Sequence, residues 1–311
     1  MRLLLPLILF LIVFTLILIG CSSIQPAPNS DKFLEFCEKL TDDQSYCYSK
    51  LRTGTSDKCM ILFHGLGDDE RAWTQHRDLS FWKTYGARLE SLQSRMGDTV
   101  PNVILITYGN KTVYNSWLFN DKPLEGRYKR WRSPREAVTE HLVNTVKTLA
   151  DKYKCTAPYY LWGVSMGGLN AIQLMLRKPE WFDKAVFISP MLPKCDPFKV
   201  SEWSCYPKPP DWNLAGGVSM IIKFNFDSYG DYSWYKSDPM VWLDKVDISK
   251  LPKIFGSNGV NDPFLLNISG KRFFDKAALL GAHVVYDLHT NEDGHNWFDD
   301  KKVYDFLKET K

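Results

Sequence analysis

One short segment of the chain has the residue types and spacing of a nucleophilic site. Residues 163–168 read GVSMGG, directly after an apolar run that ends at Trp162 and before a helix-like stretch that Pro179 interrupts. A turn this tight between strand and helix needs neighbours nearly free of side chain, and its strain holds the serine hydroxyl outward. The start of the helix would direct N–H groups toward an oxyanion. We therefore expect Ser165 to attack a carbonyl carbon.

A serine hydroxyl is a weak nucleophile at neutral pH, so it needs a base, and the base needs an acid that fixes its tautomer. Asp262 lies in a loop after the predicted strand Lys253–Gly256, and His295 lies in a loop just before the terminal helix. Serine, acid and histidine follow one another in this order in strand-turn-helix sites of this type. Asp262 and His295 are therefore the expected acid and base for Ser165.

Other histidines and carboxylates leave alternatives open. His289 would still lie at the end of a strand, whereas His76 and His141 precede the acid along the chain or sit on a helix. Asp293 is too near the C-terminal histidine to orient it easily. Asp238 is an alternative acid in a less favourable place.

The loop after the predicted strand Met60–Phe63 is expected to supply a second donor to the oxyanion. Residues 64–68 read HGLGD, and the two glycines let the chain turn beneath a carbonyl group. The N–H groups of Leu66 and Met166 would then converge on one oxygen. Losing one such donor typically costs about a hundred- to a thousandfold in rate. His64 itself is expected to be structural.

Six apolar runs are predicted as buried strands that position these residues. They are Met60–Phe63, Val103–Thr107, Tyr159–Trp162, Ala185–Ser189, Lys253–Gly256 and His283–Leu288. Between the second and third lies a helix with Ser133 as cap, Pro134 and Glu136 in its first turn, and an apolar stripe of Val138, Leu142, Val146 and Leu149. This alternation predicts an α/β fold, a mostly parallel sheet covered on both faces. Its site would lie at the carboxyl ends of the strands.

Three segments carry a resemblance to a known family: HGLGDDERAW, GVSMGGLNAIQLMLRKPEWFDKAVFISPML and DGHNWF. From Cys59 to the C-terminus the chain resembles the esterase D, or putative esterase, family of α/β-hydrolases, which includes feruloyl esterases, S-formylglutathione hydrolase and mycolyltransferases. The resemblance implies an α/β-hydrolase fold and a serine esterase. It also implies a set of roles: Ser165, Asp262 and His295 as the triad, with Leu66 and Met166 as the oxyanion hole.

Two segments match no subfamily pattern of that family. Residues 108–132 and 195–251 are rich in aromatic side chains, and both follow the carboxyl ends of predicted strands. We expect them to form an aromatic-rich insertion that borders the pocket. Aromatic walls suit an aryl group, an acyl group or a sugar ring, so the expected substrate is a small-molecule or glycan ester. The alternative is that these aromatic residues only pack the insertion onto the domain.

The expected reaction is hydrolysis of a carboxylic ester through an acyl-enzyme intermediate. An acyltransferase would use the same triad, a thioesterase or peptidase would differ only in the leaving group, and an inactive surface-binding module would need no triad. The sequence shows no metal-ligand spacing, phosphate-binding loop or dinucleotide fingerprint, so neither a cofactor nor a metal is expected.

The N-terminal residues indicate export. Arg2 precedes an apolar run from Leu3 to Ile19, and residues 18–21 read LIGC, which resembles the bacterial lipobox. The alternative is an uncleaved anchor, because the run is nearly long enough to span a bilayer. Either case predicts a membrane-anchored protein at the periplasmic or cell-surface face. The expected division is a lipoprotein signal peptide at 1–20, lipidated Cys21 and a tether at 21–30, and an α/β-hydrolase domain at 31–311.

Composition and cysteines set the remaining bounds. The 311 residues are 44% hydrophobic, and the net charge of +3 comes from scattered residues without a lysine or arginine block, so no nucleic-acid partner is expected. Beyond Cys21, six cysteines remain, and an oxidising compartment favours disulfides. We predict the pairs Cys37 with Cys47, Cys59 with Cys155, and Cys195 with Cys205. The alternative for each pair is buried free thiols.

Overall fold

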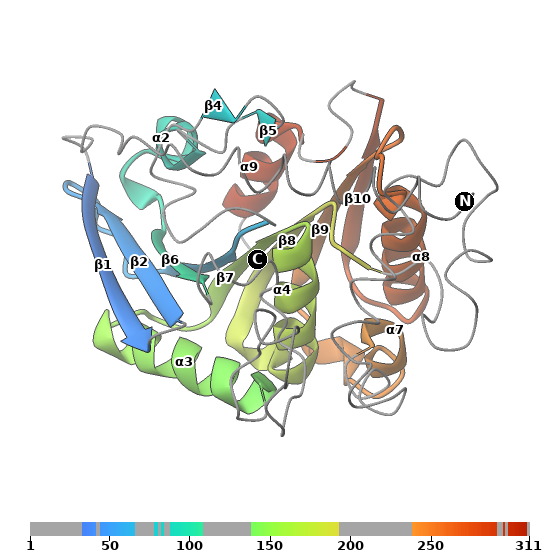
Figure 1. The fold of residues 1–311 in the computed structure, drawn as a ribbon, viewed down its shortest axis with the longest axis horizontal. Helices are drawn as coiled ribbons and strands as arrows, with labels where there is room; N and C mark the ends of the chain where they lie inside the picture. Colours follow the sequence, from blue (N-terminus) through green and yellow to red (C-terminus); the bar gives the residue numbers. More distant parts are fainter. Residues whose placement is uncertain are drawn as a thin grey trace, which may run out of the picture.

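The fold centres on one mixed sheet (Figure 1). The computed structural model of the protein describes residues 33–41, 44–65, 78–79, 82–83, 88–107, 138–192, 238–290, 295 and 298–309. Within these ranges the eight strands of this sheet follow the order β1-β2-β6-β3-β7-β8-β9-β10. They are β1 (Phe33–Thr41), β2 (Gln44–Leu51), β3 (Cys59–Phe63), β6 (Asn102–Thr107), β7 (Tyr159–Val164), β8 (Phe182–Ile188), β9 (Lys253–Gly259) and β10 (Val284–His289). Two short strands, β4 (Asp78–Leu79) and β5 (Trp82–Lys83), pair separately.

The six strands from β6 to β10 in this order are parallel, and they lie where the sequence predicts strands. Five of them are buried as predicted, but β10 is the edge strand of the sheet, and its side chains are mostly half-buried or exposed. The hairpin β1–β2 was not predicted, and it adds two antiparallel strands next to β6. Its sequence mixes apolar and charged residues, as in FLEFCEKLT, because this edge of the sheet is partly exposed. A hairpin of this kind lacks the continuous apolar run by which the buried strands are recognised.

Helices cover both faces of the sheet, as the sequence predicts. Figure 1 shows α3 (Val138–Lys152), α4 (Met166–Arg177) and α8 (Leu266–Leu279) on one side, and α2 (Arg88–Met96) and α9 (Asp300–Lys308) on the other. The remaining helical turns are η2 (Gly97–Thr99), η4 (Pro179–Trp181), α7 (Pro239–Trp242) and η5 (Ile248–Lys250). The proposed helix cap at residues 133–136 lies outside the described residues. No helix among those described has both the length and the apolar character that crossing a membrane requires.

Alternation along the buried strands builds two hydrophobic layers. In β3, Ile61 and Phe63 pack with α3, α4 and α8, whereas Met60 and Leu62 pack with α2 and α9. All four side chains are fully buried. Side chains of neighbouring positions in a strand point to opposite faces, so a strand buried on both sides must be apolar throughout. The continuous apolar runs in the sequence are the direct result.

A buried lysine holds the C-terminal helix against the sheet. Lys184 of β8 is 2% exposed, and its Nζ donates to the carbonyl oxygens of Leu307 at 2.6 Å and Glu309 at 2.5 Å. Carbonyl groups at the end of a helix lack intrahelical donors, so the ammonium group supplies them. Burial lowers the pKa of Lys184. Helix α9 begins at Asp300, and His295 lies before it in the chain.

Two of the three predicted disulfides are present. Cys37 and Cys47 join facing positions of the β1–β2 hairpin, and Cys59 and Cys155 join the start of β3 to the turn before β7. The third predicted pair, Cys195 with Cys205, lies outside the described residues.

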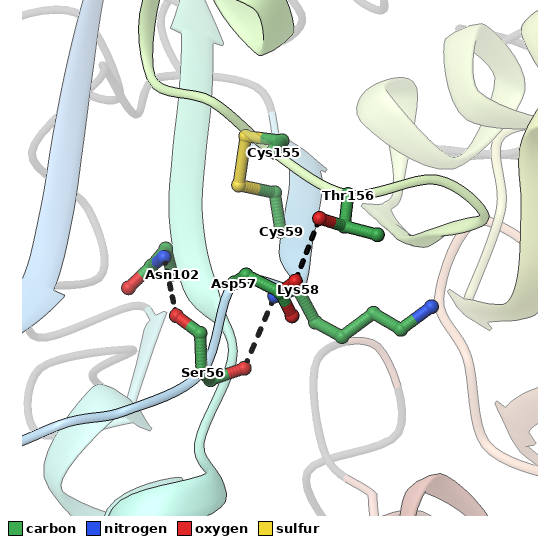
Figure 2. Close-up of a disulfide and its surroundings, with 7 residues drawn as sticks. All are labelled: Ser56, Asp57, Lys58, Cys59, Asn102, Cys155 and Thr156. Carbon is green, nitrogen blue, oxygen red and sulfur yellow. Dashed lines mark hydrogen bonds between the residues drawn. A yellow bond between two sulfur atoms is a disulfide. The ribbon is translucent and has the colours of Figure 1, made fainter.

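Figure 2 shows that the Cys59–Cys155 disulfide sits in a small network at the amino ends of the parallel strands. The Thr156 hydroxyl donates to the Asp57 carboxylate at 2.7 Å, and the Thr156 N–H donates to the Asp57 carbonyl oxygen at 2.9 Å. The Asn102 amide donates to the carbonyl oxygen of Ser56 at 3.0 Å. These contacts lie at the end of the sheet opposite to the carboxyl ends of the strands.

The two disulfides should differ in how much they stabilise the fold. Cys59–Cys155 closes a loop with a sequence separation of 96, against 10 for Cys37–Cys47. A longer loop loses more unfolded-state entropy when it is closed, so replacing both Cys59 and Cys155 by alanine should lower the free energy of unfolding by about 4 kcal/mol. The matched pair Cys37→Ala with Cys47→Ala should lose roughly 1–2 kcal/mol less. Urea titrations measure both values, and a larger loss for the hairpin pair would contradict this account.

Candidate active site

Ser165 occupies the sharp bend between β7 and α4. Strand β7 ends at Val164 and α4 begins at Met166, so one residue makes the whole turn. Its backbone angles are φ 53° and ψ −119°, a region that a side chain disfavours. Strained backbone of this kind persists only where the surrounding structure holds it, and it gathers at functional sites. The predicted strand-turn-helix context of Ser165 is present.

Close packing explains the glycines around the bend. A Cβ at Gly163 would lie 2.6 Å from the carbonyl oxygen of Gly167 and 2.7 Å from the Ala171 Cβ. A Cβ at Gly167 would overlap the carbonyl oxygens of Phe63 and His64. The first turn of α4 therefore approaches the end of β3 more closely than any residue with a side chain allows.

The neighbouring strand clamps the backbone of Ser165 from both sides. Its N–H donates to the carbonyl oxygen of Ile188 at 2.9 Å, and its carbonyl oxygen accepts from the N–H of Met191 at 2.7 Å. The turn between these partners contains Ser189, itself at φ 41°. The end of β8 thus holds the strained serine in place. Backbone groups carry this contact, so no side-chain pattern in the sequence indicates it.

The structure brings the three side chains of the predicted triad together. His295 Nε2 lies 3.0 Å from Ser165 Oγ, and His295 Nδ1 lies 3.0 Å from Asp262 Oδ2. All three residues are buried: the exposed fraction is 7% for Ser165, 6% for His295 and 1% for Asp262. In the tautomer that donates from Nδ1 to the carboxylate, Nε2 carries a lone pair that can accept the hydroxyl proton. The arrangement can make the serine oxygen nucleophilic.

Each of the three residues comes from the carboxyl end of a strand or the loop beyond it. Ser165 follows β7, Asp262 lies three residues after the end of β9, and His295 precedes α9. Strands β7, β8 and β9 are adjacent and parallel, so their carboxyl ends meet at one edge of the sheet. Residues 130 apart in sequence therefore come within hydrogen-bonding distance.

The surroundings of Asp262 are neutral and polar. Its second carboxylate oxygen, Oδ1, accepts from the N–H of Phe264 at 2.8 Å. Nearby, the Tyr286 hydroxyl donates to Asn258 Oδ1 at 3.3 Å. Burial raises the pKa of Tyr286, and neighbouring carboxylates, that of Asp262 among them, raise it further. The phenol therefore stays neutral beside the buried carboxylate.

The alternative bases and acids take other places. His289 ends β10, His141 lies within α3, and Asp238 caps α7 by accepting from the N–H of Met240 at 2.8 Å. His76 and Asp293 lie outside the described residues. His64 is held at both ring nitrogens, Nδ1 at 2.7 Å from the Gly65 carbonyl oxygen and Nε2 at 2.8 Å from Thr107 Oγ1. These contacts agree with the structural role expected for it.

Of the two expected oxyanion donors, the structure describes one. Met166 is the first residue of α4, so its N–H belongs to the group that a helix leaves without an intrahelical acceptor. Leu66 lies outside the described residues, as do residues 108–132 and 195–237 of the aromatic segments. At Gly167, helix α4 lies close to the carbonyl oxygen of His64. Gly65 and then Leu66 follow His64 in the chain. The loop that carries Leu66 therefore starts beside the bend.

Within the described residues, one group of side chains has the spacing of metal ligands: Glu35, Cys37 and Cys47. The two cysteines form a disulfide, so neither offers a thiolate. This group is not a metal site.

The sequence profile of one protein family, described as "Putative esterase", matches residues 49–299. A comparison with curated proteins found no match. The matched range, residues 49–299, includes Ser165, Asp262 and His295, the three members of the hydrogen-bonded chain described above.

Several solved structures share the fold. An S-formylglutathione hydrolase from Agrobacterium tumefaciens is 13% identical, with a TM-score of 0.59 over 92% of this chain and 96% of that one. A "putative esterase" from Staphylococcus aureus is 14% identical, with a TM-score of 0.59 over 96% and 91%. A ferulic acid esterase is 14% identical, with a TM-score of 0.55 over 89% and 95%. At these identities the likeness establishes a common architecture.

The bend should not tolerate a methyl group at Gly163. In Gly163→Ala the new Cβ must displace the Gly167 carbonyl or Ala171, and overpacking of this kind costs about 1–3 kcal/mol. We expect a lower urea midpoint and a slower reaction of Ser165 with a fluorophosphonate probe. Gly281→Ala is the control for the labelling rate: a Cβ there meets nothing within 4 Å, and the strain at φ +102° lies in the turn before β10, so this variant should lose stability without slower labelling. A control that slowed labelling as much as Gly163→Ala would contradict the role of crowding at the bend.

Proposed function

Because this chain belongs to the esterase family whose profile it matches, and is therefore a carboxylic-ester hydrolase with the α/β-hydrolase fold, we propose that Ser165 carries out the hydrolysis. The reaction passes through an acyl-enzyme intermediate. The observation that carries this proposal is the continuous hydrogen-bonded chain from Ser165 Oγ through the imidazole of His295 to the carboxylate of Asp262.

In the first step, Ser165 Oγ attacks the ester carbonyl carbon while its proton moves to His295 Nε2. The carbonyl oxygen becomes an oxyanion, which the N–H groups of Met166 and Leu66 stabilise. The carboxylate of Asp262 holds the imidazole in the required tautomer and stabilises the imidazolium that forms. The tetrahedral intermediate then collapses, and the imidazolium donates its proton to the departing alcohol.

In the second step, water attacks the acyl-serine carbonyl carbon and gives a proton to His295. The ester bond to Ser165 breaks, the hydroxyl group regains its proton, and the carboxylic acid leaves. General-base assistance of this kind contributes about a hundred- to ten-thousandfold. The low exposure of the three residues supports this mechanism, since hydrogen bonds to charged groups are stronger where water is excluded.

We propose a small-molecule or glycan ester with an aromatic or acyl group as the substrate. The aromatic content of residues 108–132 and 195–251 supports this class. One of the structural neighbours is a ferulic acid esterase, whose name agrees with an aromatic acyl group. Hydrolysis of a panel of short-chain, long-chain and aromatic esters, with product analysis in the presence of an acceptor alcohol, would identify the acyl group and separate hydrolysis from acyl transfer.

Removing any member of the triad should abolish most of the activity. With 4-nitrophenyl acetate as the probe ester, Ser165→Ala and His295→Ala should lower kcat by about 10⁴-fold or more, and Asp262→Asn by about 10⁴-fold. Ser165→Ala should also lose fluorophosphonate labelling. Asp238→Asn is the control, because Asp238 caps α7 and should leave kcat unchanged. Full labelling of the Ser165→Ala protein would disprove the assignment of the nucleophile.

We also propose that the mature protein is an exported lipoprotein, with Cys21 carrying the lipid and residues 31–311 forming the catalytic domain. The apolar run from Leu3 to Ile19 and the LIGC sequence support this proposal. The two disulfides support it too, because disulfides persist in oxidising compartments outside the cytoplasm.

The anchoring proposal predicts where the protein fractionates in a bacterial host. Wild-type protein should incorporate labelled palmitate and sediment with membranes. The Cys21→Ala variant should incorporate no label and should not be cleaved to the size of the processed protein. Ser22→Ala should behave as the wild type and serves as the control. A wild-type protein that sediments with membranes without any label would instead indicate an uncleaved N-terminal anchor.

A further inference from the structure

A backbone hydrogen bond and an unusual backbone conformation define the turn that carries Asp262. Asp262 is followed by Pro263, Phe264 and Leu265, after which α8 begins. The N–H of Leu265 donates to the Asp262 carbonyl oxygen at 2.9 Å and closes the turn. Leu265 has φ 54°, a left-handed conformation that a leucine rarely adopts. A non-glycine residue keeps such angles only where its surroundings require them.

This turn supplies a hydrogen bond to one oxygen of the Asp262 carboxylate. The N–H of Phe264 donates to Oδ1 at 2.8 Å, while Oδ2 lies 3.0 Å from His295 Nδ1. The carboxylate is therefore held at both oxygens, by the backbone on one side and by the imidazole on the other. It can rotate only by losing one of these bonds.

The side chain of the same residue contacts the imidazole. The Phe264 ring centroid lies 4.6 Å from that of His295, with 55° between the ring planes. Aromatic pairs typically have centroids about 4.5–7 Å apart, so this is a close contact. The Phe264 ring is half-buried and packs against the core, which limits its own movement. The imidazole is thus in contact with an apolar ring that packs against the core.

We propose that Phe264 is a positioning residue for the base: its N–H fixes the carboxylate of Asp262, and its ring limits the rotation of the His295 imidazole. The proposal rests on the proposed function, in which His295 is the base. Nε2 can serve only while it points at Ser165 Oγ, 3.0 Å away. The aromatic ring also favours the imidazolium that forms during the reaction, because aromatic rings attract cations within about 6 Å.

A role in positioning affects the chemical step and not substrate binding. Small displacements of a reacting group can cost up to about a hundredfold in rate. A change in the transition state alone lowers kcat and leaves KM unaltered. Measuring the change in kcat and the change in KM separately therefore distinguishes a positioning role from a structural one.

The test compares Phe264→Leu and Phe264→Tyr, which both keep the backbone N–H. With 4-nitrophenyl acetate, Phe264→Leu should lower kcat about tenfold and leave KM within about twofold, whereas Phe264→Tyr should keep kcat within about threefold. Phe182→Leu is the control, because Phe182 is buried at the opposite end of the sheet. It should lower Tm and leave kcat unchanged. Phe264→Met, also without a ring, replaces the leucine variant if that protein does not fold.

A measurement without substrate gives an independent answer. The proton between His295 Nδ1 and Asp262 Oδ2 should give a downfield NMR resonance in the wild type and in Phe264→Tyr, and it should broaden or vanish by faster exchange in Phe264→Leu. The proposal is wrong if Phe264→Leu keeps both the resonance and the wild-type kcat, or if KM alone changes. Such a result, together with the loss of labelling in Ser165→Ala, would leave the proposed function intact. Activity that persists in Ser165→Ala would instead overturn the proposed function.

Discussion

The one-residue bend between β7 and α4 is the constraint on which the rest of the structure depends. It places the first turn of α4 directly against the end of β3, where only glycine fits at position 167. The backbone of Ser165 takes up strained angles as a result, and strain of this kind costs about 1–3 kcal/mol. The central strands supply the compensation. Backbone hydrogen bonds from the end of β8 and from Met191 just beyond it hold the serine on both sides, and the buried strands β3 and β8 on either side of β7 pack closely around the bend.

The two other members of the proposed triad reach this bend because of the order of the strands. Strands β7, β8 and β9 are neighbours, so the loop after β9 brings Asp262 to the same edge as Ser165. His295 comes from a different direction, just before α9, and α9 is tied to the sheet by the buried ammonium group of Lys184. This contact joins the C-terminal end of α9 to β8, and His295 lies before the other end of the same helix.

Sequence patterns predicted the six parallel strands, the edge strand β10 among them, but not the hairpin at the other edge. The five buried strands β3, β6, β7, β8 and β9 are recognisable because burial on both faces requires apolar residues throughout. The end of α4 before Pro179 is recognisable because proline cannot continue a helix. The β1–β2 hairpin was missed because a partly exposed edge tolerates charged residues. Two disulfides join cysteines that were predicted to pair, although the spacing of the cysteines was equally compatible with free thiols. The contact of Phe264 with His295 had no sequence signal, since it depends on how a turn folds over a distant loop.

By itself the sequence determined the type of fold and the bend at Ser165, because local sterics and strand burial leave clear marks on residue type. It favoured Asp262 and His295 by their order along the chain but left other acids and histidines open. Only the tertiary structure decided that these side chains meet, at 3.0 Å for each of the two contacts with the imidazole. It also decided which backbone groups hold them: the end of β8 at Ser165 and the N–H of Phe264 at Asp262. The physical reason is that backbone donors and acceptors are the same in every residue. Their pairing across a sheet edge depends on the fold and leaves no trace in the residue types.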